Sequence, residues 1–146
     1  MFDRIYATYR ADLALAPDAL ESLDFLRRHG IPQSLLSMLR HDLLLDMIRE
    51  YELTQFFSLI EGSHRQVSGS KYDSLKCHLL RIGISPSQVT LIGDSIDDAQ
   101  SARRIGASCV LVAADSYQNI SSLQATSFIT CETLWDAVNT LMEVDT

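Results

Sequence analysis

Apolar residues along this chain switch repeatedly between two spacings. Short, mainly apolar runs, such as residues 89–92 and 109–113, are typical of strands that are buried on both faces of a sheet. Apolar positions three or four residues apart predict amphipathic helices. The runs and the helical patterns alternate, with short polar connections between them. We therefore predict an α/β fold, a three-layer Rossmann-like parallel sheet flanked by helices.

Turn residues and helix caps divide the chain into elements. Asp18 is placed to cap a helix that ends at Gly30, and Gly83 and Gly106 each follow a helical pattern. The expected strands cover residues 31–37, 56–60, 89–92, 109–113 and 128–129. The further expected helices cover residues 43–53, 71–82, 97–105 and 133–142.

The first segment lies outside this alternation. Phe2, Ile5, Tyr6, Tyr9 and Leu13 have helical spacing and predict an amphipathic helix within residues 1–15. No strand is expected before residue 31. Residues 16–146 would then form the Rossmann-like core by themselves.

Composition and charge narrow the class of protein. The 146 residues suit one domain, and the net charge of −7 argues against a non-specific nucleic-acid or anionic membrane partner. The three cysteines form no CxxC pattern, and no apolar run is long enough to span a membrane. We expect buried thiols and a cytoplasmic location.

The stretch from Gly93 to Asp98 is the first candidate for chemistry. It places Asp94 and Asp98 four residues apart, where a buried strand turns into a helix. Two carboxylates at such a turn suit Mg2+, which prefers oxygen ligands. The alternative is purely structural, with Asp94 or Ser95 capping the helix and Asp98 in its first turn.

Two further polar residues are expected at the same edge of the sheet. Ser37 ends a predicted strand, and Lys71 opens a helix after a polar loop. Either residue alone has an ordinary explanation: Ser37 could satisfy backbone groups, and Lys71 could be a solvated surface lysine. Because the carboxyl ends of parallel strands share one edge, hydroxyl, ammonium and carboxylates could converge on one pocket.

Together these residues resemble the haloacid dehalogenase (HAD) superfamily, near its phosphoglycolate-phosphatase-like branch. The resemblance rests on Ser37, Lys71 and the Gly93–Asp98 stretch with Ala102 and Gly106-Ala107 after it. It also includes the Pro17–Gly30 helix and Phe56-Phe57, and it covers roughly residues 15 to 140.

The resemblance implies a Mg2+-dependent phosphomonoester hydrolase acting on a small phosphorylated metabolite. Ser37 and Lys71 would hold the phosphoryl group, Asp94 would bind Mg2+, and Asp98 would support the metal directly or through water. The implied reaction transfers the phosphoryl group to an aspartate and then hydrolyses the phosphoaspartate.

The chain departs from the family pattern in one important respect. The family's nucleophile lies in an Asp-x-Asp motif after the first strand, and this sequence has no two aspartates separated by one residue. Residues 1–15 instead resemble the last helix of the family's cap domain. This predicts that the nucleophile, the first strand and most of the cap are lacking. Met38 and Tyr72 also stand where the family often has Asn and Pro.

A missing first strand would affect the sheet, because this strand lies at the centre in the family. The strands at residues 35–36 and 89–92 would then pair directly or leave a groove with two open edges. Open strand edges favour pairing with another chain, so we expect a partner chain or a homodimer across the incomplete sheet.

Several interpretations remain open from the sequence. The chain could be the larger part of a HAD phosphatase, inactive alone and completed by a nucleophile from elsewhere. It could instead be a non-catalytic binding module or the product of a truncated gene. A phospho-accepting receiver domain is disfavoured because its lysine should follow the acid pair, whereas Lys71 precedes Asp94.

Overall fold

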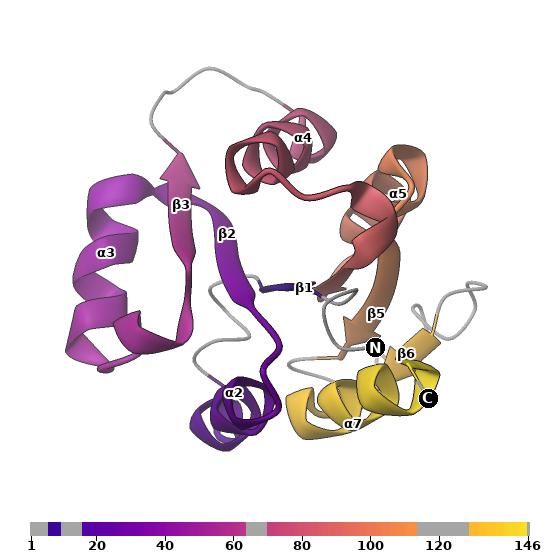
Figure 1. Ribbon diagram of the computed structural model, residues 1–146. Coiled ribbons are helices and arrows are strands. Elements are labelled where there is room, and N and C mark those ends of the chain that lie inside the picture. The colour runs from indigo at the N-terminus through magenta and orange to yellow at the C-terminus, as the bar shows by residue number, and fades with distance from the viewer. Residues whose placement is uncertain (1–5, 10–15, 64–69, 114–128, 146) are drawn as a thin grey trace.

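A computed structural model of the chain shows one parallel sheet of six strands between helices (Figure 1). It describes residues 6–9, 16–63, 70–113 and 129–145. The strands are β1 (Tyr6–Tyr9), β2 (Gln33–Arg40), β3 (Leu59–Ser63), β4 (Val89–Gly93), β5 (Ser108–Val112) and β6 (Ile129–Cys131). The helices are α2 (Ala19–Arg28), α3 (His41–Glu50), α4 (Lys71–Ile82), α5 (Ile96–Ile105) and α7 (Leu134–Asp145), with 3-10 turns η2 (Thr54–Phe56) and η3 (Pro86–Gln88).

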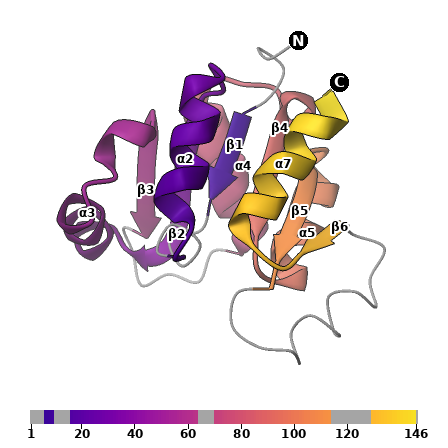
Figure 2. The same ribbon diagram turned by 90° about the horizontal axis from the view of Figure 1, so that it is seen from below.

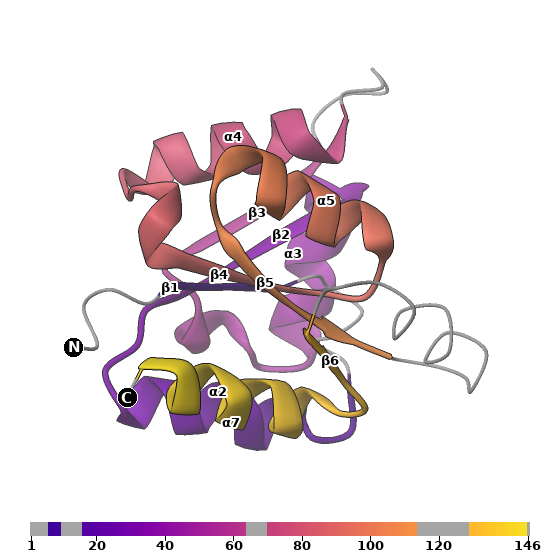
Figure 3. The ribbon, with the colours of Figure 1, turned by 90° about the vertical axis from the view of Figure 1, so that its right-hand side faces the viewer.

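The strand order is β3-β2-β1-β4-β5-β6, and every neighbouring pair is parallel. The predicted fold class, a parallel sheet flanked by helices, is therefore confirmed. In Figure 3 the helices α4 and α5 lie on one side of the sheet and α2 and α7 on the other. Seen from the α2 and α7 side in Figure 2, these two helices lie next to each other across the strands.

Strand β1 corrects the expectation for the first segment. Residues 6–9 form a strand rather than part of a helix, and it lies between β2 and β4 at the centre of the sheet. Tyr6, Thr8 and Tyr9 belong to residue types that favour strands, and two neighbouring strand edges offer hydrogen bonds on both sides. These non-local hydrogen bonds outweigh the local helical spacing. The remaining residues of the expected helix, 1–5 and 10–15, lie outside the described part of the chain.

The position of β1 also removes the expected gap. Ala7 is opposite Gln33 of β2 and Thr90 of β4, so β2 and β4 neither pair directly nor leave an open groove. The central position that was expected to be missing is therefore occupied. β1 thus fills the central position at which we expected open edges, whereas a partner chain or homodimer stays a prediction. The sheet includes residues 6–9 as well as strands after residue 16.

Each face of the sheet has its own core. On the α2 and α7 side, Leu23, Leu35 and Ile92 are fully buried, and α3 adds Leu44 and Ile48 to the same cluster. On the other side, α4 and α5 pack over β4 through a smaller cluster. The residues of this smaller cluster are Leu75, Leu79, Val89, Leu91 and Ala102. The smaller core supports the edge of the sheet where the candidate site lies.

Asp18 caps a different helix from the one expected. At the start of α2 its side chain makes no capping hydrogen bond. Instead Oδ2 of Asp18 accepts a hydrogen bond of 2.7 Å from the backbone N–H of Trp135, in the first turn of α7. The carboxylate therefore satisfies an N-terminal donor of a helix that is distant in sequence. Sequence spacing could not indicate this partner.

Two strand boundaries also differ from the sequence expectation. Residues 54–56 form η2, which places Phe56 in the core, so that β3 begins only at Leu59. The expected strand at residues 128–129 is observed as β6, Ile129–Cys131, and Phe128 lies outside the described residues. Among the helices that the structure describes, none is long and apolar enough to cross a membrane.

Candidate functional site

Two helix N-termini meet at the carboxyl edge of the sheet. Lys71 is the first residue of α4, because the hydroxyl of Ser70 accepts a hydrogen bond of 3.2 Å from the N–H of Asp73 and caps the helix. From this position the Lys71 ammonium donates to Oγ of Ser95 at 3.1 Å. It also lies 3.5 Å from Oδ1 of Asp98. Lys71 is thus an ordered cation between the two helices rather than a solvated surface lysine.

Asp98 is the most constrained residue of the site. Its side chain is 6% exposed, and Oδ2 accepts backbone hydrogen bonds from Asp94 at 3.1 Å and from Ser95 at 3.3 Å. The hydroxyl of Ser95 accepts a hydrogen bond of 3.2 Å from the N–H of Asp98 in return. Ser95 and Asp98 therefore form a capping box at the start of α5. Asp98 therefore has the structural role in the first turn of the helix that the sequence allowed as an alternative to metal binding.

Gly93 allows the Asp98 carboxylate to approach the strand so closely. A Cβ atom at residue 93 would lie 2.7 Å from both Cβ and Oδ2 of Asp98. Such contacts are too short for a real side chain, so the strand must end in glycine for the capping box to form. The glycine at position 93 thus has a steric reason that is independent of catalysis.

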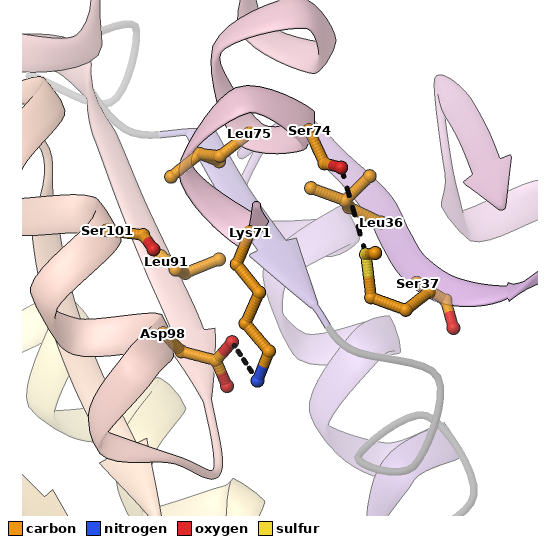
Figure 4. Close-up of a pocket in the computed structure, with 9 residues that line it drawn as sticks. Leu36, Ser37, Lys71, Ser74, Leu75, Leu91, Asp98 and Ser101 are labelled. Atoms are coloured by element: carbon orange, nitrogen blue, oxygen red, sulfur yellow. Dashed lines mark hydrogen bonds and ion pairs between the residues drawn. The ribbon is translucent and has the colours of Figure 1, made fainter. Parts of the chain in front are cut away.

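Ser37 lies on β2, on the opposite side of the pocket from Asp98. The pocket is lined by Ser37, Lys71 and Asp98, together with Leu36, Met38, Ser74, Leu75, Leu91 and Ser101. Figure 4 shows Lys71 reaching toward Asp98, while the Ser37 hydroxyl points away from both. Oγ of Ser37 accepts a hydrogen bond of 3.0 Å from the N–H of Leu39. The hydroxyl hydrogen of Ser37 is therefore available to donate. The hydroxyl oxygen also satisfies a backbone N–H group, which is the structural role that the sequence allowed for Ser37.

Asp94 follows β4 directly and is half-buried. Its backbone N–H holds Asp98, but its side chain does not line the pocket that contains Lys71. The structure therefore brings Ser37, Lys71 and Asp98 to one pocket, whereas Asp94 is joined to it only through its backbone bond to Asp98. The expected convergence of these residues at one edge of the sheet is observed in this form.

The residues can be tested for their fit to Mg2+. The carboxylates of Asp94 and Asp98 have the right donor chemistry, since Mg2+ is often held by one or two carboxylates together with water and substrate oxygens. Both oxygens of Asp98 are already engaged, Oδ2 by two backbone N–H groups and Oδ1 by Lys71. In the described ranges, no group of three or more His, Cys, Asp or Glu residues is placed to hold a metal ion. The pair fits a weak, water-rich site.

The central strand β1 is close in the sheet to the strands that carry the candidate residues. β1 is parallel to its neighbours β2 and β4, so its carboxyl end lies at the same edge of the sheet as theirs. The residue that follows Tyr9 is Arg10, and no aspartate pair with one residue between its members occurs in the sequence. Among the described residues that line the pocket, the charged ones are Lys71 and Asp98.

Two contacts of the site are not predicted by the sequence. The sequence predicts Ser95 only as a cap, yet its hydroxyl also accepts the hydrogen bond from Lys71. The hydroxyl of Ser74 donates to Sδ of Met38 at 3.8 Å and joins α4 to β2 across the pocket. The Ser-x-x-Asp spacing indicates the capping box of Ser95 with Asp98, but the bond from Lys71 depends on how α4 packs against α5. The second contact depends on how α4 packs against the sheet, and no local pattern predicts it.

Comparison with known proteins identifies the family to which this fold and this candidate site belong. The sequence profile of the haloacid dehalogenase-like hydrolases matches residues 1–112. The chain belongs to this family of hydrolases.

Individual relatives agree with this assignment. Phosphoglycolate phosphatase of Escherichia coli K12 is 26% identical over 108 residues, which are 73% of this chain and 43% of the relative. The phosphoglycolate phosphatase of Pseudomonas savastanoi is 25% identical over 111 residues, 75% of this chain and 41% of the relative. The chain thus spans less than half the length of these curated relatives.

Solved structures support the same fold. A HAD-superfamily hydrolase from Ehrlichia chaffeensis has a TM-score of 0.71 and 25% identity, with 90% of this chain and 59% of that chain covered. A structure described as a beta-phosphoglucomutase of Thermotoga maritima has a TM-score of 0.74 at 19% identity, covering 88% of this chain and 60% of that chain. The second similarity concerns the fold alone.

Proposed function

We propose that this chain is the phosphoryl-binding part of a Mg2+-dependent HAD phosphomonoesterase that acts on a small phosphorylated metabolite in the cytoplasm. The observation that carries the proposal is the position of Lys71. Its ammonium is held between Ser95 and Asp98 at a pocket that Ser37 also lines. A fixed cation beside a hydroxyl and two helix N-termini is a favourable environment for a phosphate group.

Each residue has a distinct task in this proposal. Lys71 places its charge against a phosphoryl oxygen, and Ser37 turns its hydroxyl to donate to a second oxygen. Asp98 orients Lys71 and supports the metal site, while Asp94 supplies a carboxylate for Mg2+. The metal, when bound, neutralises charge on the phosphoryl oxygens. All four residues are those that the family resemblance singled out.

The chemical step requires a carboxylate from outside this sequence. A bond forms between an aspartate oxygen and phosphorus, the bond from phosphorus to the ester oxygen breaks, and the leaving alcohol takes up a proton. Water then hydrolyses the phosphoaspartate and releases orthophosphate. We infer that a separate polypeptide or a segment beyond this sequence supplies the nucleophile, so this chain alone has almost no phosphatase activity.

Binding of orthophosphate tests the proposal without the nucleophile. A 31P NMR titration of the chain should show saturable binding that strengthens with Mg2+. Lys71→Met should weaken it about tenfold or more, the value of a charge-assisted hydrogen bond. Asp94→Asn should remove the Mg2+ effect but leave binding without metal unchanged. The exposed Lys76 of α4 supplies the control Lys76→Met, which should bind as the wild type does.

Two results would contradict the proposal. One is phosphate binding that is equal in the wild type, Lys71→Met and Lys76→Met, because the charge of Lys71 would then play no part. The other is strong phosphatase turnover by the chain that survives Asp94→Asn, because the metal-dependent mechanism would then be wrong.

A second candidate is a non-catalytic binding module. It is favoured because both oxygens of Asp98 already interact with groups of the protein itself. In addition, exposed apolar side chains lie near the same edge of the sheet, those of Met38, Leu39 and Leu43. Such a module would associate with another protein through this edge and would bind phosphate weakly. A strict monomer in light scattering that captures no partner in pull-down, yet binds phosphate through Lys71, excludes it.

A further inference from the structure

A second group of polar side chains is buried under α4, away from the pocket. His78 and Ser34 are fully buried, and Glu61 is 8% exposed. Nδ1 of His78 lies 2.6 Å from Oε1 of Glu61, and Nε2 lies 2.8 Å from Oγ of Ser34. Arg81 forms an ion pair with the other oxygen of Glu61. The side chain of Arg81 is 59% exposed, so we call Ser34, Glu61 and His78 the buried polar cluster.

The protonation of His78 follows from its surroundings. Burial lowers the pKa of His78, although the Glu61 carboxylate acts in the opposite direction. In the neutral ring one nitrogen donates and the other accepts. The carboxylate can only accept, so Nδ1–H donates to Glu61 and Nε2 accepts from the Ser34 hydroxyl. His78 thus makes one hydrogen bond to β3 and one to β2, both from α4.

The order Ser-His-Glu is that of a hydrolytic triad, but the location excludes this role. Ser34 has no exposed surface, and neither Ser34 nor His78 lines the pocket around Lys71. A nucleophile must reach its substrate. A cluster of this kind between a helix and two strands instead fixes how these elements lie against each other, because buried polar groups tolerate few alternative arrangements.

The buried polar cluster has a defined relation to the candidate site. His78 follows Lys71 by two helical turns, so it lies about 10 Å along α4 from the lysine on a similar face. Ser34 precedes Ser37 on β2 by three residues, which is also about 10 Å. The bond between Ser34 and His78 therefore joins α4 and β2 at the same depth below the pocket.

We propose that His78 is a positioning residue, which sets the place of Lys71 on α4 relative to Ser37 on β2 through its hydrogen bond to Ser34. The proposal deepens the proposed function, since the pair that is positioned is the phosphoryl-binding pair. The contact of Ser74 with Met38 near the pocket then completes an alignment that the Ser34–His78 bond begins. The hydrogen bond to Glu61 contributes to stability, while the bond to Ser34 determines ligand affinity.

Two substitutions separate the two bonds of His78. His78→Asn keeps a donor near the place of Nδ1, so it keeps the charge-assisted hydrogen bond to Glu61 but loses the one to Ser34. His78→Gln keeps a polar atom near the place of Nε2, so it keeps the hydrogen bond to Ser34 but loses the one to Glu61. Because charge-assisted bonds are the stronger ones, we expect His78→Gln to be the less stable variant. Lys76→Gln, on the exposed face of the same helix, is the control.

Orthophosphate affinity should follow the opposite order. We expect His78→Asn to weaken binding about tenfold and His78→Gln to stay within about threefold of wild type, as Lys76→Gln does. A structural role alone would make affinity fall with stability, and His78→Gln would then bind worse. Weaker binding by His78→Gln, or equal binding by both variants, would overturn the proposal.

The ammonium signal of Lys71 in 15N–1H NMR gives a readout that needs no phosphate. It should move in His78→Asn and keep its wild-type position in His78→Gln and Lys76→Gln. If wild type binds no orthophosphate, the proposed function fails, and this signal alone decides the positioning role. An unmoved Lys71 signal in His78→Asn would refute that role even if phosphate binds.

Discussion

Nζ of Lys71 and Oδ1 of Asp98 lie 3.5 Å apart, and this pair joins the first turn of α4 to the first turn of α5. Asp98 is almost completely buried, whereas Lys71 reaches it from a partly exposed position. The two helices leave different strand ends, yet their N-termini are joined by a cation and an anion. The pair therefore has a structural task in addition to the proposed binding of phosphate.

The Lys71–Asp98 pair should show measurable coupling in a double-mutant cycle. Lys71→Met and Asp98→Asn keep the approximate side-chain shapes, and urea unfolding of the single and double variants should give a coupling of about 1 kcal/mol. The control is Arg49–Asp46, whose N–O distance is also 3.5 Å but whose side chains are 68% and 72% exposed. This exposed pair should couple less strongly. Equal coupling in the two cycles would show that burial of Asp98 adds nothing.

Gly93→Ala should destabilise the protein by about 2–3 kcal/mol, because the new methyl group would overlap with Asp98 and disrupt the capping box. The loss is measured by urea unfolding. Ser108→Ala, at the exposed start of the neighbouring strand, should stay within about 0.5 kcal/mol of the wild type. A Gly93→Ala variant of wild-type stability would mean that the approach of Asp98 to the strand is not obligatory.

Stability should depend on pH through His78. Its pKa is lowered in the folded state, so below the unfolded value of about 6.5 the unfolded chain takes up a proton that the folded chain does not. The free energy of unfolding should therefore fall as the pH drops from 7 toward 5, by at most about 1.4 kcal/mol per pH unit from this group. Urea unfolding across this range measures the slope. His78→Gln should have a shallower slope, and an unchanged slope would contradict the assignment to His78.

Asp18→Ala should weaken the start of α7 rather than the start of α2. Loss of the hydrogen bond to the Trp135 N–H should cost about 1 kcal/mol, a typical value for a helix cap. Amide hydrogen exchange should become faster in the first turn of α7. Asp24→Ala is the comparison, because Asp24 forms ion pairs with the exposed Arg27 and Arg28 of its own helix, and their loss should have little effect. Faster exchange confined to α2 would be the opposite result.

The parts of the fold that sequence predicted correctly are those with strong local signals. The Val89–Ile92 run, Gly93 and the Ser-x-x-Asp cap define β4 and α5 almost completely. The start of α4 at Lys71 and its end at Gly83 are similarly marked by Ser70 and by a left-handed glycine with φ of 79°. Such local signals placed the candidate residues at one edge of the sheet.

The parts that sequence did not predict depend on partners that are distant in the chain. β1 has a helical spacing, and only the strands on both sides of it explain its conformation. Asp18 caps a helix that begins more than a hundred residues later. Ser34, Glu61 and His78 each look unremarkable in their own segment, and their meaning arises only where β2, β3 and α4 meet.

The central place of β1 also constrains the order in which the chain can fold. Tyr6 is opposite Val89 and Tyr9 is opposite Ile92, so this strand is completed on one side only after β4 has been synthesised. Such long-range pairings slow folding because a large loop must close first. During synthesis on the ribosome, β1 must wait until β4 has emerged before it can pair with this second neighbour. Until then, the strand edges that will enclose β1 are exposed, and chaperone binding during this interval would protect them from aggregation.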